Sequence, residues 1–170
     1  MKKSSKMMLI ACGVIAVLLA AFFIPVLTDT QPELTQKDAE KMLERMSDAF
    51  YRKNDRDVIS FAFDDAKVAG RTLQTMHEYL KRAFVNVKDL DVHFTDMRYK
   101  RDGERVKLDT FVTASDKNRS TGQAGETYYR QPVTFTVDRR AYPHLLGLVY
   151  TFEWKISQVE APNLPNIDKI

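Results

Sequence analysis

The spacing of apolar residues changes once along this chain. Between residues 36 and 84 apolar side chains recur every three or four positions, and from Leu90 onward they alternate with polar ones. The first spacing is typical of amphipathic helices, and the second is typical of strands with one buried face. Helices followed by a meander of antiparallel strands make an α+β arrangement. The sequence therefore predicts an α+β domain with three N-terminal helices packed on an antiparallel sheet of four long strands.

Residue types at the ends of the helical segments support this division. We expect helices at 36–53, 57–61 and 73–84. Thr35 precedes the first helix and forms a capping-box pattern with Asp38, three residues later. Asp55 and Thr72 are placed to cap the second and third helices. A short strand at 66–69, ended by Gly70, is expected between these two helices.

Four stretches in which apolar and polar residues alternate predict the four long strands, and the apolar residues of each stretch form its inward row. The rows fall at 90–99, 105–114, 129–137 and 146–156. Met97 and Tyr99 are out of phase with the residues before them, which predicts a β-bulge near Thr95-Asp96. Asp102-Gly103 is a hairpin signal. Pro132 implies either an edge strand or a backbone nitrogen that points out of the ladder.

An uncharged segment near the N-terminus predicts a membrane anchor. Met7 to Leu27 contains no charge and would span roughly 30 Å as a helix, the thickness of a bilayer core. Lys2, Lys3 and Lys6 precede it and favour the cytoplasmic side. The prediction is a single-pass protein of the bacterial cytoplasmic (inner) membrane, with its C-terminal domain outside the cytoplasm. Its expected parts are a basic N-terminus (1–6), a signal anchor (7–27), a linker (28–34), an α+β domain (35–160) and an extended tail (161–170).

Two alternatives compete with a retained anchor. A cleaved signal peptide would have a shorter apolar core and a small-residue cleavage site, which the sequence before Thr28 lacks. Leu9-Ile10-Ala11-Cys12 resembles a lipobox, and lipidation of Cys12 is the minority interpretation because the apolar run continues past it. Cys12 is the only cysteine, so the outer domain has no disulfide, thiol nucleophile or cysteine-based zinc site.

The charge balance excludes one class of partner. The chain has 26 basic and 23 acidic residues, and three of the basic ones precede the anchor, which leaves 26 − 3 = 23 of each sign outside it. A nucleic-acid-binding domain normally carries a basic surface. We therefore expect no nucleic-acid partner.

The outer domain resembles the nuclear transport factor two-like superfamily, which includes SnoaL-like and ketosteroid-isomerase-like proteins. The resemblance covers about residues 35–160 and rests on element order and on these segments: Asp48-Ala49-Phe50-Tyr51, Asn54-Asp55-Arg56-Asp57-Val58, Phe61 to Val68, Gly70, and Phe152-Glu153-Trp154-Lys155-Ile156. It implies a cone-shaped α+β barrel, in which a curved sheet wraps around the helices, often with a pocket at the wide end. It also implies a homodimer through the outer sheet face.

The inward rows of the strands contain few groups that could do chemistry. We expect an apolar pocket with seven candidate lining residues: Phe61, Met76, Leu80, Tyr129, Gln131, Tyr150 and Trp154. No catalytic residue is assigned. His77, Tyr51 and Asp65 are the remaining candidates, although a hydrogen-bonded surface histidine, a packing tyrosine and a turn-capping acid are simpler interpretations. Asp91 and His93 fall on the outward row. No metal-binding, phosphate-loop or G-x-S-x-G pattern occurs, and no cofactor is expected.

Three functions remain open from the sequence. The favoured hypothesis is a membrane-anchored, extracytoplasmic, non-enzymatic domain that binds or scaffolds a protein partner or a small apolar ligand. The second is a small-molecule enzyme of the SnoaL or ketosteroid-isomerase-like class. The third is an inner-membrane assembly component of a secretion system, which shares the architecture of one anchor and one such domain.

Overall fold

The computed structural model describes residues 33–87, 90–117, 124–144 and 149–162. The expected anchor at 7–27 and most of the expected linker and tail lie outside these residues. No helix within the described ranges has the length and apolarity needed to cross a membrane. The described residues fall into two units, a larger one within 34–140 and 154–162 and a smaller one of residues 33, 141–144 and 149–153.

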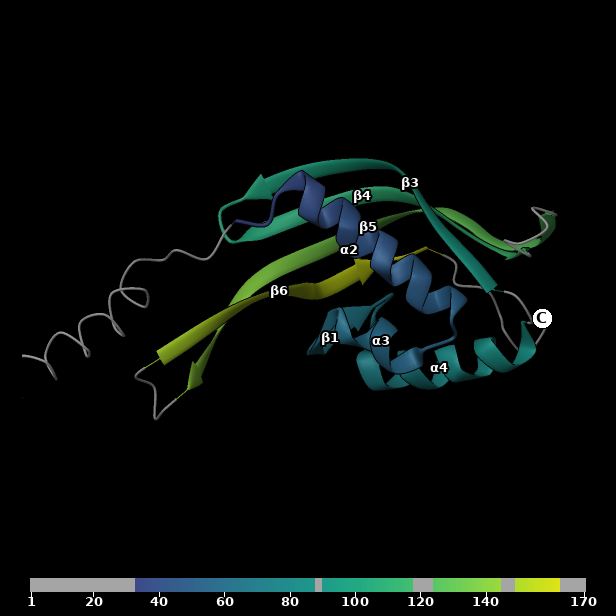
Figure 1. Cartoon of the computed structure of the whole chain (residues 1–170), viewed down its shortest axis with the longest axis horizontal. Coiled ribbons are helices and arrows are strands. Elements are labelled where there is room, and N and C mark those ends of the chain that lie inside the picture. Colours follow the sequence, from purple (N-terminus) through teal and green to yellow (C-terminus); the bar gives the residue numbers. More distant parts are fainter. Residues whose placement is uncertain (1–32, 88–89, 118–123, 145–148, 163–170) are drawn as a thin grey trace, which may run out of the picture. The chain divides into compact units, whose positions relative to one another are not determined.

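Three helices belong to the larger unit (Figure 1). They are α2 (Gln36–Tyr51), α3 (Asp55–Ser60) and α4 (Leu73–Asn86). Thr35 and Asp38 form the predicted capping box, and the Thr72 side chain caps α4 as predicted. The cap of α3 is Asn54 rather than Asp55, because the helix begins two residues earlier than its apolar spacing indicated.

The sheet is larger than predicted. It has six strands in the order β2-β1-β6-β5-β4-β3, whereas four long strands and one short strand were expected. The strands are β1 (Ala62–Val68), β2 (Arg71–Thr72), β3 (Leu90–Asp102), β4 (Arg105–Lys117), β5 (Ala124–His144) and β6 (Val149–Glu160). β1 runs parallel to β6, so the sheet is mixed rather than antiparallel. β1 was predicted too short because Asp64 and Asp65 are both exposed and break its alternation.

The β3–β4 hairpin carries two predicted features. The register shifts between Thr95 and Arg98, and Asp96 has a φ of 54°, so the predicted bulge is confirmed. Asp102 pairs with Arg105, and Gly103 occupies the first loop position with a φ of 59°. Glycine adopts this left-handed conformation without steric penalty, which explains the Asp-Gly signal.

The buried face of the central strands follows the predicted rows. Leu108 pairs with Phe135 and Val106 with Val137, and all four side chains are buried against the helices. β5 lies between β4 and β6, so the edge position considered for Pro132 is excluded.

The opposite face carries the charges. Arg105 Nε donates to Asp138 Oδ1 at 2.7 Å and its Nη2 donates to Oδ2 at 3.2 Å, across directly paired residues. This two-bond geometry is the strongest form of an arginine–carboxylate pair. It aligns β4 with β5 at the end of the sheet next to the hairpin.

The smaller unit includes the end of β5 and the start of β6. Tyr142 and Tyr150 are both exposed there, Tyr150 by 45%. The apolar row expected at 146–156 is therefore not inward-facing at Tyr150. Leu146 and Leu148 of that row lie outside the described residues.

Candidate functional site

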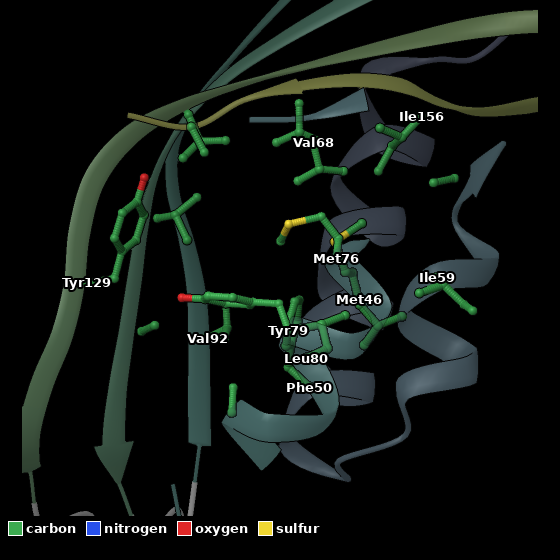
Figure 2. Close-up of a pocket in the computed structure, with 18 of the residues that line it drawn as sticks. Met46, Phe50, Ile59, Val68, Met76, Tyr79, Leu80, Val92, Tyr129 and Ile156 are labelled. Atoms are coloured by element: carbon green, nitrogen blue, oxygen red, sulfur yellow. The ribbon is translucent and has the colours of Figure 1, made fainter. Parts of the chain in front are cut away.

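The larger unit contains an apolar cavity of ≈ 220 Å³ that is partly open to solvent (Figure 2). All three helices and five of the six strands contribute to its wall. Six residues illustrate the lining: Met46, Phe50, Met76, Leu80, Val92 and Ile156. The cavity lies between the apolar stripes of α2 and α4 and the inward rows of the strands, which is where the two periodicities of the sequence meet.

Local sequence explains why these side chains converge. Met76, Leu80 and Ala83 are spaced by four and three residues, so they lie on one face of α4. On β3, Leu90, Val92 and Phe94 alternate toward the cavity. The Ser47 hydroxyl donates to the Val92 carbonyl oxygen at 2.5 Å and holds α2 against this strand.

Two phenols supply the polar side-chain atoms among the described residues that line the cavity. Tyr79 comes from α4 and Tyr129 from β5. Burial raises the pKa of both hydroxyls, so both remain protonated at neutral pH. The Tyr129 hydroxyl donates to the Pro162 carbonyl oxygen at 2.9 Å. This bond holds the segment after β6 in place, where Ala161, assigned to the tail by its sequence, completes part of the wall.

This composition limits what the cavity can bind. No lysine, arginine, histidine or acid is among its described lining residues. A buried charge without a partner is strongly disfavoured, so the cavity suits a neutral guest. The described residues also contain no group of three or more histidines, cysteines or acids that could hold a metal ion.

Several solved structures share this architecture at low sequence identity. The Aln2 protein of a Streptomyces species matches with a TM-score of 0.58 and 12% identity, over 76% of this chain and 89% of that one. A Nostoc punctiforme protein of unknown function with a cystatin-like fold matches with a TM-score of 0.54 and 11% identity, over 79% and 98%. Bd1075 of Bdellovibrio bacteriovorus matches with a TM-score of 0.55 and 11% identity, over 73% of this chain and 40% of that one.

The fold is nuclear transport factor two-like. No protein-family model matches the sequence. No curated protein matches it either. At these identities the nuclear transport factor two-like fold is what is shared, and a fold of this kind does not specify a ligand or a reaction.

Of the seven pocket candidates, three line the cavity of this nuclear transport factor two-like domain: Met76, Leu80 and Tyr129. Phe61 and Trp154 pack against the buried core outside the cavity, and the Arg45 guanidinium lies 5.7 Å from the Phe61 ring centre. Gln131 is half-buried and is not a lining residue. Tyr150 belongs to the smaller unit.

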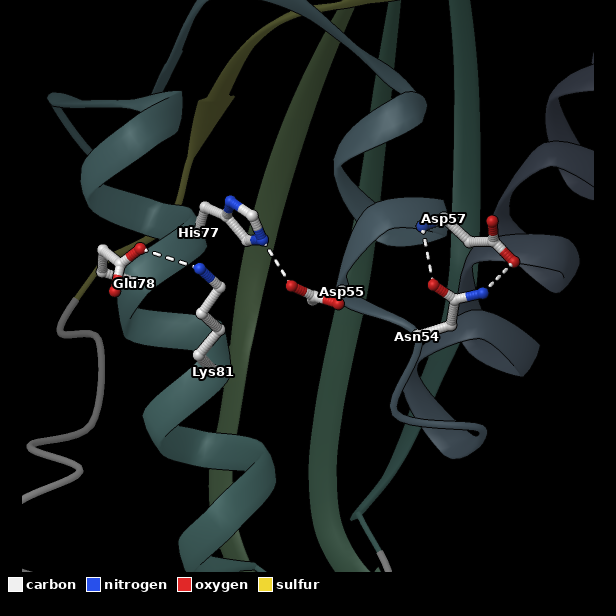
Figure 3. A network of polar contacts seen from close by, with 6 residues as sticks. All are labelled: Asn54, Asp55, Asp57, His77, Glu78 and Lys81. Atoms are coloured by element: carbon white, nitrogen blue, oxygen red, sulfur yellow. Dashed lines mark hydrogen bonds and ion pairs between the residues drawn. The ribbon is translucent and has the colours of Figure 1, made fainter.

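The three titratable candidates lie apart from the cavity lining. His77 on α4 bonds through Nε2 to the Asp55 carboxylate on α3, and this bond lowers the pKa of Asp55 (Figure 3). Both side chains are about a quarter exposed. Asp65 accepts a hydrogen bond from Arg140 Nη1 at 2.7 Å, which lowers its pKa. Tyr51 is half-buried at the end of α2 and is not a lining residue.

The contacts around His77 are those of a helix–helix junction. The Asn54 side chain caps α3 and bonds to Asp57 at 2.7 Å, and Lys81 bonds to Glu78 at 3.0 Å along α4 (Figure 3). The His77–Asp55 bond links these two local pairs. It therefore ties α3 to α4 through residues that do not line the cavity.

Sequence reasoning missed two informative residues. Tyr79 follows Met76 by three positions and precedes Ala83 by four, so helical spacing alone places it on the cavity side of α4. Asp91 is 0% exposed, although its row was expected to face outward. Its neighbours Leu90 and Val92 line the cavity, so Asp91 lies on the other face of β3, where its carboxylate bonds to His93 Nε2 at 2.6 Å.

Proposed function

We propose that this chain is a membrane-anchored, extracytoplasmic, non-enzymatic domain that binds a small neutral apolar molecule. The observation that carries the proposal is the ≈ 220 Å³ cavity, whose described lining is apolar except for two phenols. An engineered protein cavity of about 150 Å³ with a similar lining takes up benzene. The volume here therefore suits a guest of one or two fused small rings, or a short branched hydrocarbon.

The expected anchor adds a second supporting argument. An uncharged helix at Met7 to Leu27 would hold the domain next to a bilayer. Small apolar molecules concentrate in and near bilayers because they leave water. A domain held there meets such molecules at the highest local concentration. This placement can be tested with a reporter enzyme that is active only outside the cytoplasm, fused after Ile170.

An enzymatic role has less support. General acid–base catalysis needs a titratable group within hydrogen-bond reach of the substrate. The described lining offers Tyr79 and Tyr129, whose raised pKa values make them poor bases at neutral pH. His77, Tyr51 and Asp65 are not lining residues.

The binding proposal is tested by filling the cavity. Ala83 lines the cavity on α4, and Ala83→Leu would place three more carbon atoms in the space that a guest needs. Val85, two residues later, is 82% exposed, so Val85→Leu is a matched control on the same helix. The full chain in lipid nanodiscs would be titrated with indane by calorimetry, with empty discs correcting for partition into lipid.

We expect the wild type and Val85→Leu to bind indane equally, and Ala83→Leu to bind it at least about tenfold more weakly, because the guest and the new side chain compete for one volume. Wild-type protein that takes up no indane would overturn the proposal. So would an Ala83→Leu variant that binds it as well as the wild type.

A further inference from the structure

The two phenol oxygens give the cavity a polar side. Tyr79 reaches from α4 toward the strands, and its oxygen lies on the side of the cavity where Tyr129 lies (Figure 2). The two groups are close enough that an ionised Tyr129 contributes to raising the pKa of Tyr79. The labelled residues on the helix side of the cavity are hydrocarbon or thioether. A guest that matches this arrangement has an apolar body and one polar group.

The hydrogen bond of Tyr129 determines what kind of polar group fits. A phenol has one hydrogen to donate and two lone pairs that accept. The Tyr129 hydrogen is directed to the Pro162 carbonyl oxygen at 2.9 Å, and a carbonyl oxygen can only accept. Tyr129 is 8% exposed, so little water reaches it. What its oxygen offers to a guest is therefore an acceptor.

We propose that the guest is a neutral alcohol or phenol whose hydroxyl donates a hydrogen bond to the Tyr129 oxygen. Tyr129 is then the residue that selects a hydroxyl over a carbonyl at the same position of the guest. This inference rests on the proposed function, because it names the class of molecule that the cavity takes.

A charged guest is disfavoured by the same surroundings. Desolvation is the largest cause of the raised pKa of each phenol, and it acts against an ionised guest in the same way. Arg71 on β2 is exposed, and its charge lowers the pKa of Tyr79, so it is the cation that a carboxylate would use. It is not a lining residue.

Four guests of one shape separate these possibilities. Indane, indanol, indanone and indane carboxylate present a hydrocarbon, a hydroxyl, a carbonyl and an anion. Each would be titrated into the full chain in nanodiscs, with partition corrected by empty discs. We expect indanol to bind about fivefold more tightly than indanone, the effect of one net hydrogen bond, and indane carboxylate to bind most weakly.

Two variants assign the preference to one oxygen. Tyr129→Phe should bring indanol and indanone within about twofold of each other, a comparison made within the one variant whatever its affinity for indane. Tyr79→Phe, the matched change on the facing wall, should keep the preference for indanol. The wild-type series tests the selectivity even where a variant fails to fold.

The remaining outcomes are also decisive. Indane binding without a preference for indanol, or a preference that Tyr129→Phe retains, would overturn this inference and leave the proposed function standing. Tightest binding of indane carboxylate would overturn it in favour of a site that uses Arg71. Absence of binding by all four molecules would overturn both proposals.

Discussion

The ammonium nitrogen of Lys53 lies 2.8 Å from the carbonyl oxygen of Phe84 and 2.7 Å from that of Val87. Both carbonyls are at the end of α4, where backbone acceptors lack helical partners. A positive charge there also interacts favourably with the helix dipole. Lys53 follows α2, so one side chain fastens the end of α2 to the end of α4, and both helices form walls of the cavity.

Replacing this lysine should destabilise the domain. Lys53→Met keeps the side-chain stem and removes both hydrogen bonds, so we expect a loss of about 1–3 kcal/mol in the free energy of unfolding. Urea unfolding followed by tryptophan fluorescence measures it. Lys41→Met, at an exposed position on α2, should change stability by less than about 0.5 kcal/mol. Equal effects of the two changes would contradict the capping role.

The Arg105–Asp138 pair should make stability depend on pH. The hydrogen bond from Arg105 lowers the folded-state pKa of Asp138 below its unfolded value of about 4. A carboxyl group with a lowered folded-state pKa contributes stability above that pH, and the contribution is lost as pH falls through the folded pKa. Asp138→Asn should therefore be less stable than wild type at pH 7 and show a smaller loss of stability below pH 4. The exposed Asp64→Asn serves as control, and a wild-type acid profile in Asp138→Asn would refute the assignment.

The His77–Asp55 bond predicts a change that nuclear magnetic resonance can resolve. Its loss in His77→Ala should raise the pKa of Asp55 toward the ordinary aspartate value, because this bond is the largest cause of the lowering. Carboxyl carbon shifts followed against pH report the pKa, and Asp138 in the same spectra should not change. Indane affinity should stay within about twofold of wild type. A larger loss of affinity would show that His77 acts on the cavity.

Substitutions of the bulge residue Asp96 test whether its left-handed backbone conformation is strained. Its φ of 54° is left-handed, a conformation that costs about 1–2 kcal/mol for residues with a β-carbon and most for branched ones. Asp96→Val should destabilise the domain by roughly this amount, and Asp96→Gly should lie within about 0.5 kcal/mol of wild type. Thermal unfolding compares them, with Arg98→Val as the control on the same strand. A fully tolerated Asp96→Val would mean that the strand realigns and the bulge is lost.

Features with local causes were predictable from the sequence. The caps at Thr35 and Thr72 need only a hydroxyl and a backbone N–H three residues away. The bulge at Asp96 follows from a change of phase within one strand. The alternation from Val106 to Val112 fixes which side chains are buried, because a strand buries every second residue.

Features that depend on distant neighbours were not predictable. The parallel pairing of β1 with β6 joins segments about ninety residues apart, and nothing near Ala62 encodes its partner Ile156. Asp91 alternates with Leu90 as the row predicts, yet it is fully buried on the outer face, and its own sequence position does not indicate this. Tyr79 was left out of the predicted apolar face of its helix because tyrosine carries a polar hydroxyl. Its ring is apolar, however, and it lies at helical spacing from Met76.

The cavity should also make the stability of the native state depend on hydrostatic pressure. Unfolding a protein changes its volume by about −20 to −100 mL/mol, and the change scales with the internal space that unfolding eliminates. The part of this ≈ 220 Å³ that stays dry should therefore make the native state less resistant to pressure than that of a densely packed domain of the same size. A guest that occupies the space would restore its resistance.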